Sequence, residues 1–221
     1  MDKKKAFAIA ERIRGFVLCK GPIILKKYLP DCRNGERILF NKYPSPDGTL
    51  GIFLLLKKDR FSIDSSILNP LEKRITEILI FEESLEKIKN ETNSSRLQDK
   101  FEEFTEKILR KEFGSKVRNV DREHMNEYDF KIENATLSVT VEVKSDKWKS
   151  TGNISLELLR DYRKRNDENI GSILKTEATF WQVYYYDEKK DEVSSEMFLV
   201  SQLKYETCKV LLKLKRKLNL I

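Results

Sequence analysis

The chain of 221 residues is 39% hydrophobic and 36% charged, which indicates a soluble globular protein with a buried core and a strongly charged surface. No apolar run reaches the roughly eighteen residues of a membrane span, and Glu11 interrupts the first apolar stretch, so neither a transmembrane helix nor a secretory signal is expected. The net charge of +7 favours a polyanionic partner.

The first 90 residues are predicted to form a small α+β extension. Apolar residues recur at helical spacing over residues 3–18, and short apolar runs around a turn predict two strands at 38–43 and 50–57. Helical spacing of apolar residues resumes after Pro70 and continues to Ile88. The extension is therefore expected to end with a helix.

A polar run at residues 90–95 predicts the boundary between this extension, residues 1–90, and a second domain, residues 91–221. The second domain opens with a helix from Ser95 that Gly114 is expected to end. Its further elements are predicted as strands at 117–120, 128–132, 137–143 and 180–186, a helical segment before the last strand, and a basic helix over 209–221. The expected fold class is α/β (α+β), a mixed central sheet with the order helix, three strands, helix, strand.

The cysteine and histidine content limits the chemistry. Three widely spaced cysteines, Cys19, Cys32 and Cys208, lack the spacing of a zinc or redox motif, so free thiols in a reducing, cytoplasmic environment are expected. The single histidine, His124, excludes a histidine-rich zinc site and is expected to lie in a loop. Catalysis is therefore expected to depend on carboxylates and lysines.

The strand predicted within "ATLSVTVEVKSDKW" carries two charged side chains on one face. Valines alternate along it, so Glu142 and Lys144 lie opposite Val141 and Val143. Asp129 lies in the preceding strand, "NEYDFKI", and its carboxylate can converge with that of Glu142 if the two strands are neighbours. A structural ion pair between Glu142 and Lys144 is the alternative interpretation.

Two nearby carboxylates repel each other unless a cation lies between them. Oxygen ligands in a partly hydrated site suit Mg²⁺ or Mn²⁺ better than zinc. Such an ion lowers the pKa of a bound water and orients a phosphate, and an adjacent lysine can stabilise the developing negative charge. The pattern therefore indicates hydrolysis of phosphodiester bonds.

The residues "YDF" and "EVK", with twelve residues between Asp129 and Glu142, resemble the PD-(D/E)XK nuclease superfamily, whose members share a core of helix, three strands, helix, strand. The resemblance implies that Asp129 and Glu142 bind Mg²⁺ or Mn²⁺, that Lys144 orients the attacking water, and that the carbonyl of Val143 completes the metal shell. Tyr128 stands where many members have a proline.

Further roles follow from the same resemblance. A spacing similar to that of archaeal Holliday junction resolvases makes Glu102, or alternatively Glu103, the helix carboxylate that assists the metal. A likeness to phage-type nucleases of the superfamily gives Glu157 an accessory catalytic role and makes Lys175 and Thr176 candidates for phosphate contact.

Contacts with nucleic acid are expected just beyond the lysine strand. In "SDKWKSTGN", Trp148 lies between Lys147 and Lys149 and is a candidate for contacting nucleic acid. Trp181 lies in an apolar strand pattern and is expected to be a core residue. The basic C-terminal helix is expected either to follow phosphates or to keep a docking helix soluble.

The resemblance implies a viral or phage-like endonuclease that depends on Mg²⁺ or Mn²⁺ and acts on DNA more readily than on RNA. Residues 1–90 are expected to provide specificity, dimerisation or partner binding. Three alternatives remain: a nucleic-acid-binding module of the same fold without activity, an RNA endonuclease of the same fold, and an interaction protein that acts through residues 1–90.

Overall fold

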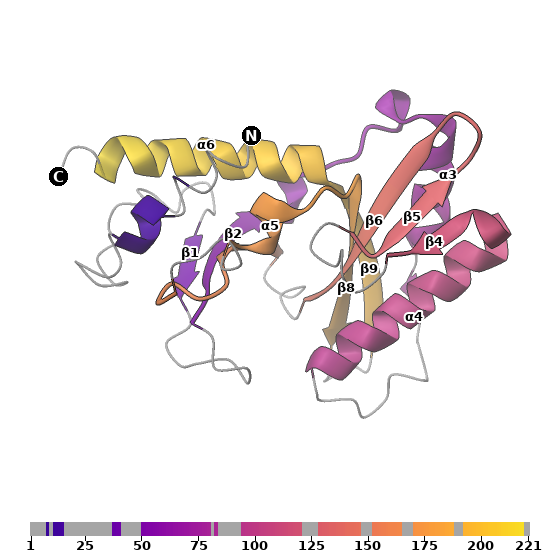
Figure 1. The fold of residues 1–221 in the computed structure, drawn as a ribbon, viewed down its shortest axis with the longest axis horizontal. Coiled ribbons are helices and arrows are strands. Elements are labelled where there is room, and N and C mark those ends of the chain that lie inside the picture. Colours follow the sequence, from indigo (N-terminus) through magenta and orange to yellow (C-terminus); the bar gives the residue numbers. More distant parts are fainter. Residues whose placement is uncertain are drawn as a thin grey trace. The chain divides into compact units, whose positions relative to one another are not determined.

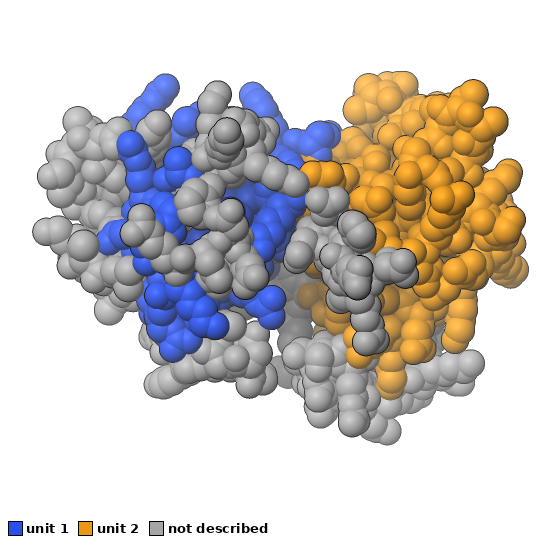
Figure 2. All heavy atoms as spheres, in the orientation of Figure 1, with its two compact units in different colours: residues 1–60, 152–175, 201–221 blue, residues 61–151, 176–200 orange. Residues whose placement is uncertain are grey.

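The computed structural model describes residues 8, 11–15, 37–40, 50–80, 82–83, 94–120, 128–146, 152–164, 170–187 and 192–218. The chain divides into two compact units (Figure 2), where unit 1 comprises residues 1–60, 152–175 and 201–221, and unit 2 comprises residues 61–151 and 176–200. Helices and strands occur in both units, in agreement with the expected α/β class. The division differs from the boundary expected near residue 90, because segments that are distant in sequence pair with each other.

Unit 1 contains a three-stranded antiparallel sheet (Figure 1). Its order is β1-β2-β7, formed by β1 (Arg37–Phe40), β2 (Ile52–Lys57) and β7 (Asn153–Leu159). The pair β1 and β2 confirms the two strands expected in the extension, with slightly different ends. The sequence did not predict β7, whose pairing with β2 brings residues 152–175 into this unit.

Helical segments also belong to this unit, and residues 11–15, within the helix predicted over 3–18, are helical. The short helix α5 (Ser172–Lys175) follows β7, and α6 (Val200–Leu218) ends the described chain. The basic helix expected over 209–221 therefore begins earlier than predicted, directly after the last strand. Gly171 allows the close approach of α5 to β7, since a Cβ there would lie 1.9 Å from the carbonyl oxygen of Glu157.

Unit 2 contains a six-stranded mixed sheet with the order β3-β9-β8-β6-β5-β4. Its strands are β3 (Glu82–Glu83), β4 (Val117–Asn119), β5 (Phe130–Glu133), β6 (Ser138–Asp146), β8 (Phe180–Asp187) and β9 (Glu192–Leu199). Strands β6 and β8 are parallel, and every other neighbouring pair is antiparallel. Strands β4, β5, β6 and β8 confirm predicted strands, whereas β3 and β9 were not predicted.

Helix α3 (Pro70–Leu79) shows why one predicted helix was too long. It begins with a capping box between Asn69 and Glu72 and has Pro70 in its first turn, both strong start signals. The prediction extended it to Ile88, which is wrong. The helix ends at Leu79, whose carbonyl oxygen accepts buried hydrogen bonds from Gln182 Nε2 at 2.7 Å and Ser195 Oγ at 2.8 Å.

Helix α4 (Ser94–Phe113) confirms the helix expected from Ser95. Gly114 follows it with φ of 58°, a left-handed conformation that glycine adopts without strain, and opens the short 3₁₀ helix Gly114–Lys116. Helices α3 and α4 contact each other and pack on the sheet, α4 along β4 and β6 and α3 along β9 (Figure 1). Two further 3₁₀ turns, Lys58–Arg60 and Ser65–Ile67, precede α3.

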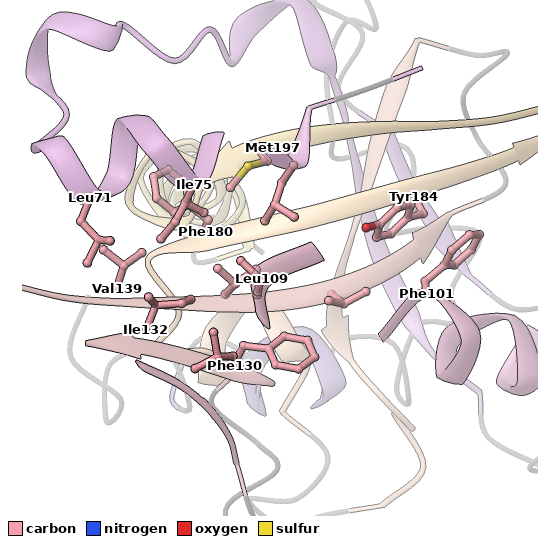
Figure 3. Packing of buried hydrophobic residues seen from close by; sticks show 14 of the residues in the cluster. Leu71, Ile75, Phe101, Leu109, Phe130, Ile132, Val139, Phe180, Tyr184 and Met197 are labelled. Carbon is pink, nitrogen blue, oxygen red and sulfur yellow. The ribbon is translucent and has the colours of Figure 1, made fainter. Parts of the chain in front are cut away.

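The core of unit 2 lies between these helices and one face of the sheet (Figure 3). The ring of Phe101 on α4 stacks on Tyr184 of β8 with a centroid distance of 4.5 Å. The alternate residues Val139, Val141 and Val143 of β6 are fully buried in this core. The residues between them, Glu142 among them, therefore point to the opposite face of the sheet.

Candidate active site

Asp129, immediately before β5, lies against β6. The backbone N–H of Asp129 donates to the Val141 carbonyl at 3.0 Å, and the Val143 N–H then donates to Oδ2 of Asp129 at 2.6 Å. The carboxylate therefore takes the place that the next residue of a neighbouring strand would occupy. The short length of this bond is typical of a charge-assisted hydrogen bond.

Gln98 bridges α4 and the same edge of β6. Its Nε2 donates to the Val143 carbonyl and to Oε1 of Glu102, both at 2.7 Å, and its Oε1 accepts from the Ser145 N–H at 2.8 Å. The sequence did not indicate this role. The only local signal is the spacing of four between Gln98 and Glu102, which places the two side chains on one face of a helix.

Glu142 is buried, and both of its carboxylate oxygens are bound. Trp181 Nε1 donates to Oε2 at 2.7 Å, and Lys144 Nζ forms an ion pair with Oε1. The Lys144 ammonium also lies over the Trp181 ring, 5.6 Å from its centroid, a cation–π contact. The side chain of Glu142 is 9% exposed and that of Lys144 is 32% exposed, so solvent reaches the pair from the ammonium side.

Trp181 is buried, as the sequence predicted, and it also has a polar role. In the parallel pair of β6 and β8, Trp181 lies opposite Glu142, so both side chains project from the same face. The indole N–H lies 3.5 Å from Oγ1 of the buried Thr176 as well. Its role as a donor to Glu142 depends on the register of two strands, which the sequence alone does not reveal.

The pKa of Asp129 depends on the charges of Glu102, Glu142 and Lys144. The pKa of this carboxyl group is raised to about 7, chiefly by burial and also by the charges of Glu102 and Glu142, while the Val143 amide and the Lys144 charge lower it. Glu102, Asp129, Glu142 and Lys144 thus share one electrostatic neighbourhood. A cation at this position would relieve the repulsion among the three carboxylates.

Glu102 and Glu103, the two alternatives for the helix carboxylate, have different surroundings in the structure. Glu102 is half-buried, contacts Gln98 and acts on the pKa of Asp129. Glu103 is exposed and lines a shallow hollow on the outer surface of α4 with Glu106 and Arg110. Of the two, only Glu102 is thus connected to Gln98 and Asp129.

The donor set fits Mg²⁺ or Mn²⁺ in its chemistry, since it consists of carboxylates and a backbone carbonyl. In the described part of the chain, no three histidine, cysteine, aspartate or glutamate side chains are already gathered to hold a metal ion. Glu142 is bound by Lys144 and Trp181, and the Val143 carbonyl is bound by Gln98. A metal would have to share or replace these contacts.

Two predicted site residues belong to unit 1. Glu157 is in β7 of unit 1, opposite Phe53, and its Oε2 accepts from the Ser172 N–H at 3.1 Å. Lys175 ends α5, also in unit 1. The cluster in unit 2 does not include either residue. The remaining candidates, Lys147, Trp148, Lys149 and His124, lie outside the described residues.

None of the helices that the structure describes has the length and apolar character needed to cross a membrane. Comparisons with protein-family models, with curated proteins and with solved structures found no match. The residues of the site and their contacts are therefore the basis for a functional proposal.

Proposed function

We propose that this protein is a divalent-metal-dependent nuclease of the PD-(D/E)XK type, with its active site at the N-terminal end of β5 in unit 2. The observation that carries the proposal is Asp129: a carboxylate held against β6 by the Val143 amide, in one electrostatic neighbourhood with Glu102, Glu142 and Lys144. The element order α4, β4, β5, β6, α5, β8 gives further support, although β7 is inserted before α5.

The protein's residues have distinct roles in this proposal. Asp129 and Glu142, assisted by Glu102 and the Val143 carbonyl, would hold Mg²⁺ or Mn²⁺. When bound, such an ion lowers the pKa of a water and stabilises negative charge on the phosphate. Trp181 keeps Glu142 in one orientation through the indole hydrogen bond.

Lys144 is the residue that faces the substrate in the proposed reaction. It carries three N–H donors, so it can keep one contact with Glu142 while another donor orients the attacking water or binds a phosphate oxygen. Its partial exposure leaves room for such a contact. Because the charge that develops on the phosphate is negative, the ammonium stabilises the transition state more than the ground state.

The proposed substrate is DNA, with RNA as the alternative. The net charge of +7 supports a nucleic acid of either kind. Duplex, branched and single-stranded forms of labelled DNA and RNA, each incubated with Mg²⁺, Mn²⁺ or EDTA, would identify the substrate. Cleavage is expected with either metal ion and not with EDTA.

The decisive variants are Glu142→Ala and Lys144→Ala, each expected to lower the cleavage rate by at least about 100-fold. A matched control exists on the neighbouring strand, where Lys131 and Glu133 form an ion pair at the same spacing of two residues. Lys131→Ala is expected to cleave like the wild type. Cleavage that survives both Glu142→Ala and Lys144→Ala would overturn the proposal.

A nucleic-acid-binding module without cleavage is the second candidate. The observation that favours it is the engagement of both Glu142 oxygens by Lys144 and Trp181, which stabilises the carboxylate without a metal. Binding measured by fluorescence anisotropy that persists in EDTA, together with no cleavage of any substrate in Mg²⁺ or Mn²⁺, would support this function in place of the first.

A further inference from the structure

The carboxamide of Gln98 has an orientation that its partners determine. The Ser145 N–H can only donate, so it must face Oε1, and the Val143 carbonyl can only accept, so it must face Nε2. The second hydrogen of Nε2 then points to Oε1 of Glu102. All three hydrogen bonds are between 2.7 and 2.8 Å long. The side chain is therefore held at both ends of its polar group.

The carboxamide of Gln98 takes the place of a peptide group from a neighbouring strand. Strand β5 pairs with β6 only as far as Val141, and the edge of β6 continues beyond it with the polar groups of Val143 and Ser145. Asp129 accepts from the Val143 N–H, and Gln98 binds the next carbonyl and the next N–H along this edge. A peptide group of a neighbouring strand would make the same two bonds. Gln98 thus joins α4 to the part of β6 that lies beyond its pairing with β5.

We propose that Gln98 is a positioning residue that fixes two oxygen donors of the metal site, Glu102 and the Val143 carbonyl. The inference rests on the proposed function. A glutamate on a half-exposed helix face samples several rotamers, and the bond from Nε2 selects one of them. The same nitrogen bonds the Val143 carbonyl, so the distance between these two donors is set by one planar group.

The expected size of the effect follows from groups that orient metal ligands in other proteins. Loss of such a partner lowers metal affinity by about 10–100-fold, because the ligand must be ordered when the metal binds. The proposal gives Gln98 no direct bond to the metal: its Nε2 orients Glu102 and the Val143 carbonyl, and its Oε1 accepts from Ser145. Its removal is therefore expected to weaken metal binding without abolishing it.

The test compares the full-length wild type with Gln98→Met, which keeps similar side-chain volume and removes the donor and acceptor. Titration calorimetry with MnCl₂ alone is expected to give a dissociation constant about 10–100-fold higher in the variant. Asp99→Asn, at the neighbouring exposed position, is the control and is expected to match the wild type. Gln98→Asn, whose amide is one methylene too short to bridge, replaces Gln98→Met if that variant does not fold.

Two further readouts separate positioning from general destabilisation. Amide hydrogen exchange is expected to become faster at Ser145, which loses its acceptor, and to stay slow at Val143, which keeps Asp129. In cleavage assays the loss is expected to disappear at saturating Mn²⁺, because Gln98 does not contact the reacting atoms.

The outcomes distinguish this inference from the function on which it rests. A wild type that binds Mn²⁺ and cleaves nucleic acid, with equal Mn²⁺ affinity in Gln98→Met, overturns the positioning role alone. Unchanged exchange at Ser145 overturns the bridge itself. A wild type that neither binds Mn²⁺ nor cleaves overturns the proposed function, and the metal role of Gln98 with it.

Discussion

The backbone amide of Val143 donates a 2.6 Å hydrogen bond to Oδ2 of Asp129, which attaches the aspartate that precedes β5 to the strand that carries Glu142 and Lys144. This bond favours the ionised carboxylate. Burial and the neighbouring charges of Glu102 and Glu142 act against it and raise the pKa of Asp129 to about 7. The metal-free site therefore holds a carboxyl group that ionises at a cost to the folded state.

The first prediction concerns stability and pH. The pKa of Asp129 is about 7 in the folded protein against 3.8 for the free group, so the folded state holds this proton more tightly. The contribution of protonated Asp129 to the free energy of unfolding is fully present below pH 3.8. It falls by about 1.4 kcal/mol per pH unit as the pH rises to about 7. Asp129→Asn removes this contribution and is expected to gain stability relative to the wild type towards pH 8.

Urea unfolding of the metal-free wild type and of Asp129→Asn, measured from pH 4 to pH 8, checks this expectation. The difference between the two free energies of unfolding isolates Asp129 from the other titrating groups. A constant difference across the whole range would contradict it.

The second prediction concerns the helix carboxylate. Because the charge of Glu102 raises the pKa of Asp129, Glu102→Gln is expected to lower that pKa. Glu103→Gln, one position along the helix and exposed, is expected to leave it unchanged. An NMR titration of the ¹³C-labelled aspartate carboxyl groups measures both. Equal shifts in the two variants would mean that Glu102 does not lie near Asp129.

The third prediction compares the loss of a polar group from two buried aromatic residues of β8, Trp181 and Tyr184. Trp181→Phe removes the donor to a buried carboxylate and is expected to cost about 1.5–3 kcal/mol of stability and to reduce cleavage. Tyr184→Phe removes a hydroxyl bonded to Thr105 at 2.7 Å, at a cost of about 1 kcal/mol, with cleavage unchanged. Chemical denaturation and cleavage rates test both. Equal activity in the two variants would remove Trp181 from the site.

The fourth prediction concerns a close backbone approach in unit 1. Gly171→Ala places a Cβ 1.9 Å from the Glu157 carbonyl oxygen, a backbone atom, so β7 and α5 must separate. The expected loss is about 1–3 kcal/mol or more. Gly15→Ala has open space around the new Cβ and is expected to be neutral or slightly stabilising. Thermal unfolding of the two variants provides the comparison, and similar melting temperatures would be inconsistent with this packing.

Local signals were sufficient to predict part of the fold. The helix that Gly114 ends, the strands β1 and β2, and the alternation along β6 follow from periodicity and turn residues. Strand β9 was missed because its buried Ser194 and Ser195 interrupt the apolar alternation. The end of α3 was missed because distant donors on β8 and β9 bind the Leu79 carbonyl.

The candidate site, too, could be predicted only in part from local sequence. Alternation on β6 was enough to select Glu142 and Lys144, and an apolar strand context was enough to select Asp129. Gln98 and Trp181 gain their roles from the packing of α4 on β6 and from the register of β6 with β8. Neither relationship is encoded within a short window of sequence.

The interleaving of the two units along the chain has a consequence for biosynthesis. The chain passes from one unit to the other four times, so a fragment ending near residue 90 contains neither unit complete. On the ribosome, the apolar strand β2 must wait for β7, and β6 must wait for β8, while residues between them are translated. Until then each strand has one edge without its partner, although β1 can already pair with β2 and β5 with β6. Exposed strand edges of this kind are prone to aggregate. Recombinant production should therefore favour the intact chain over separately expressed fragments.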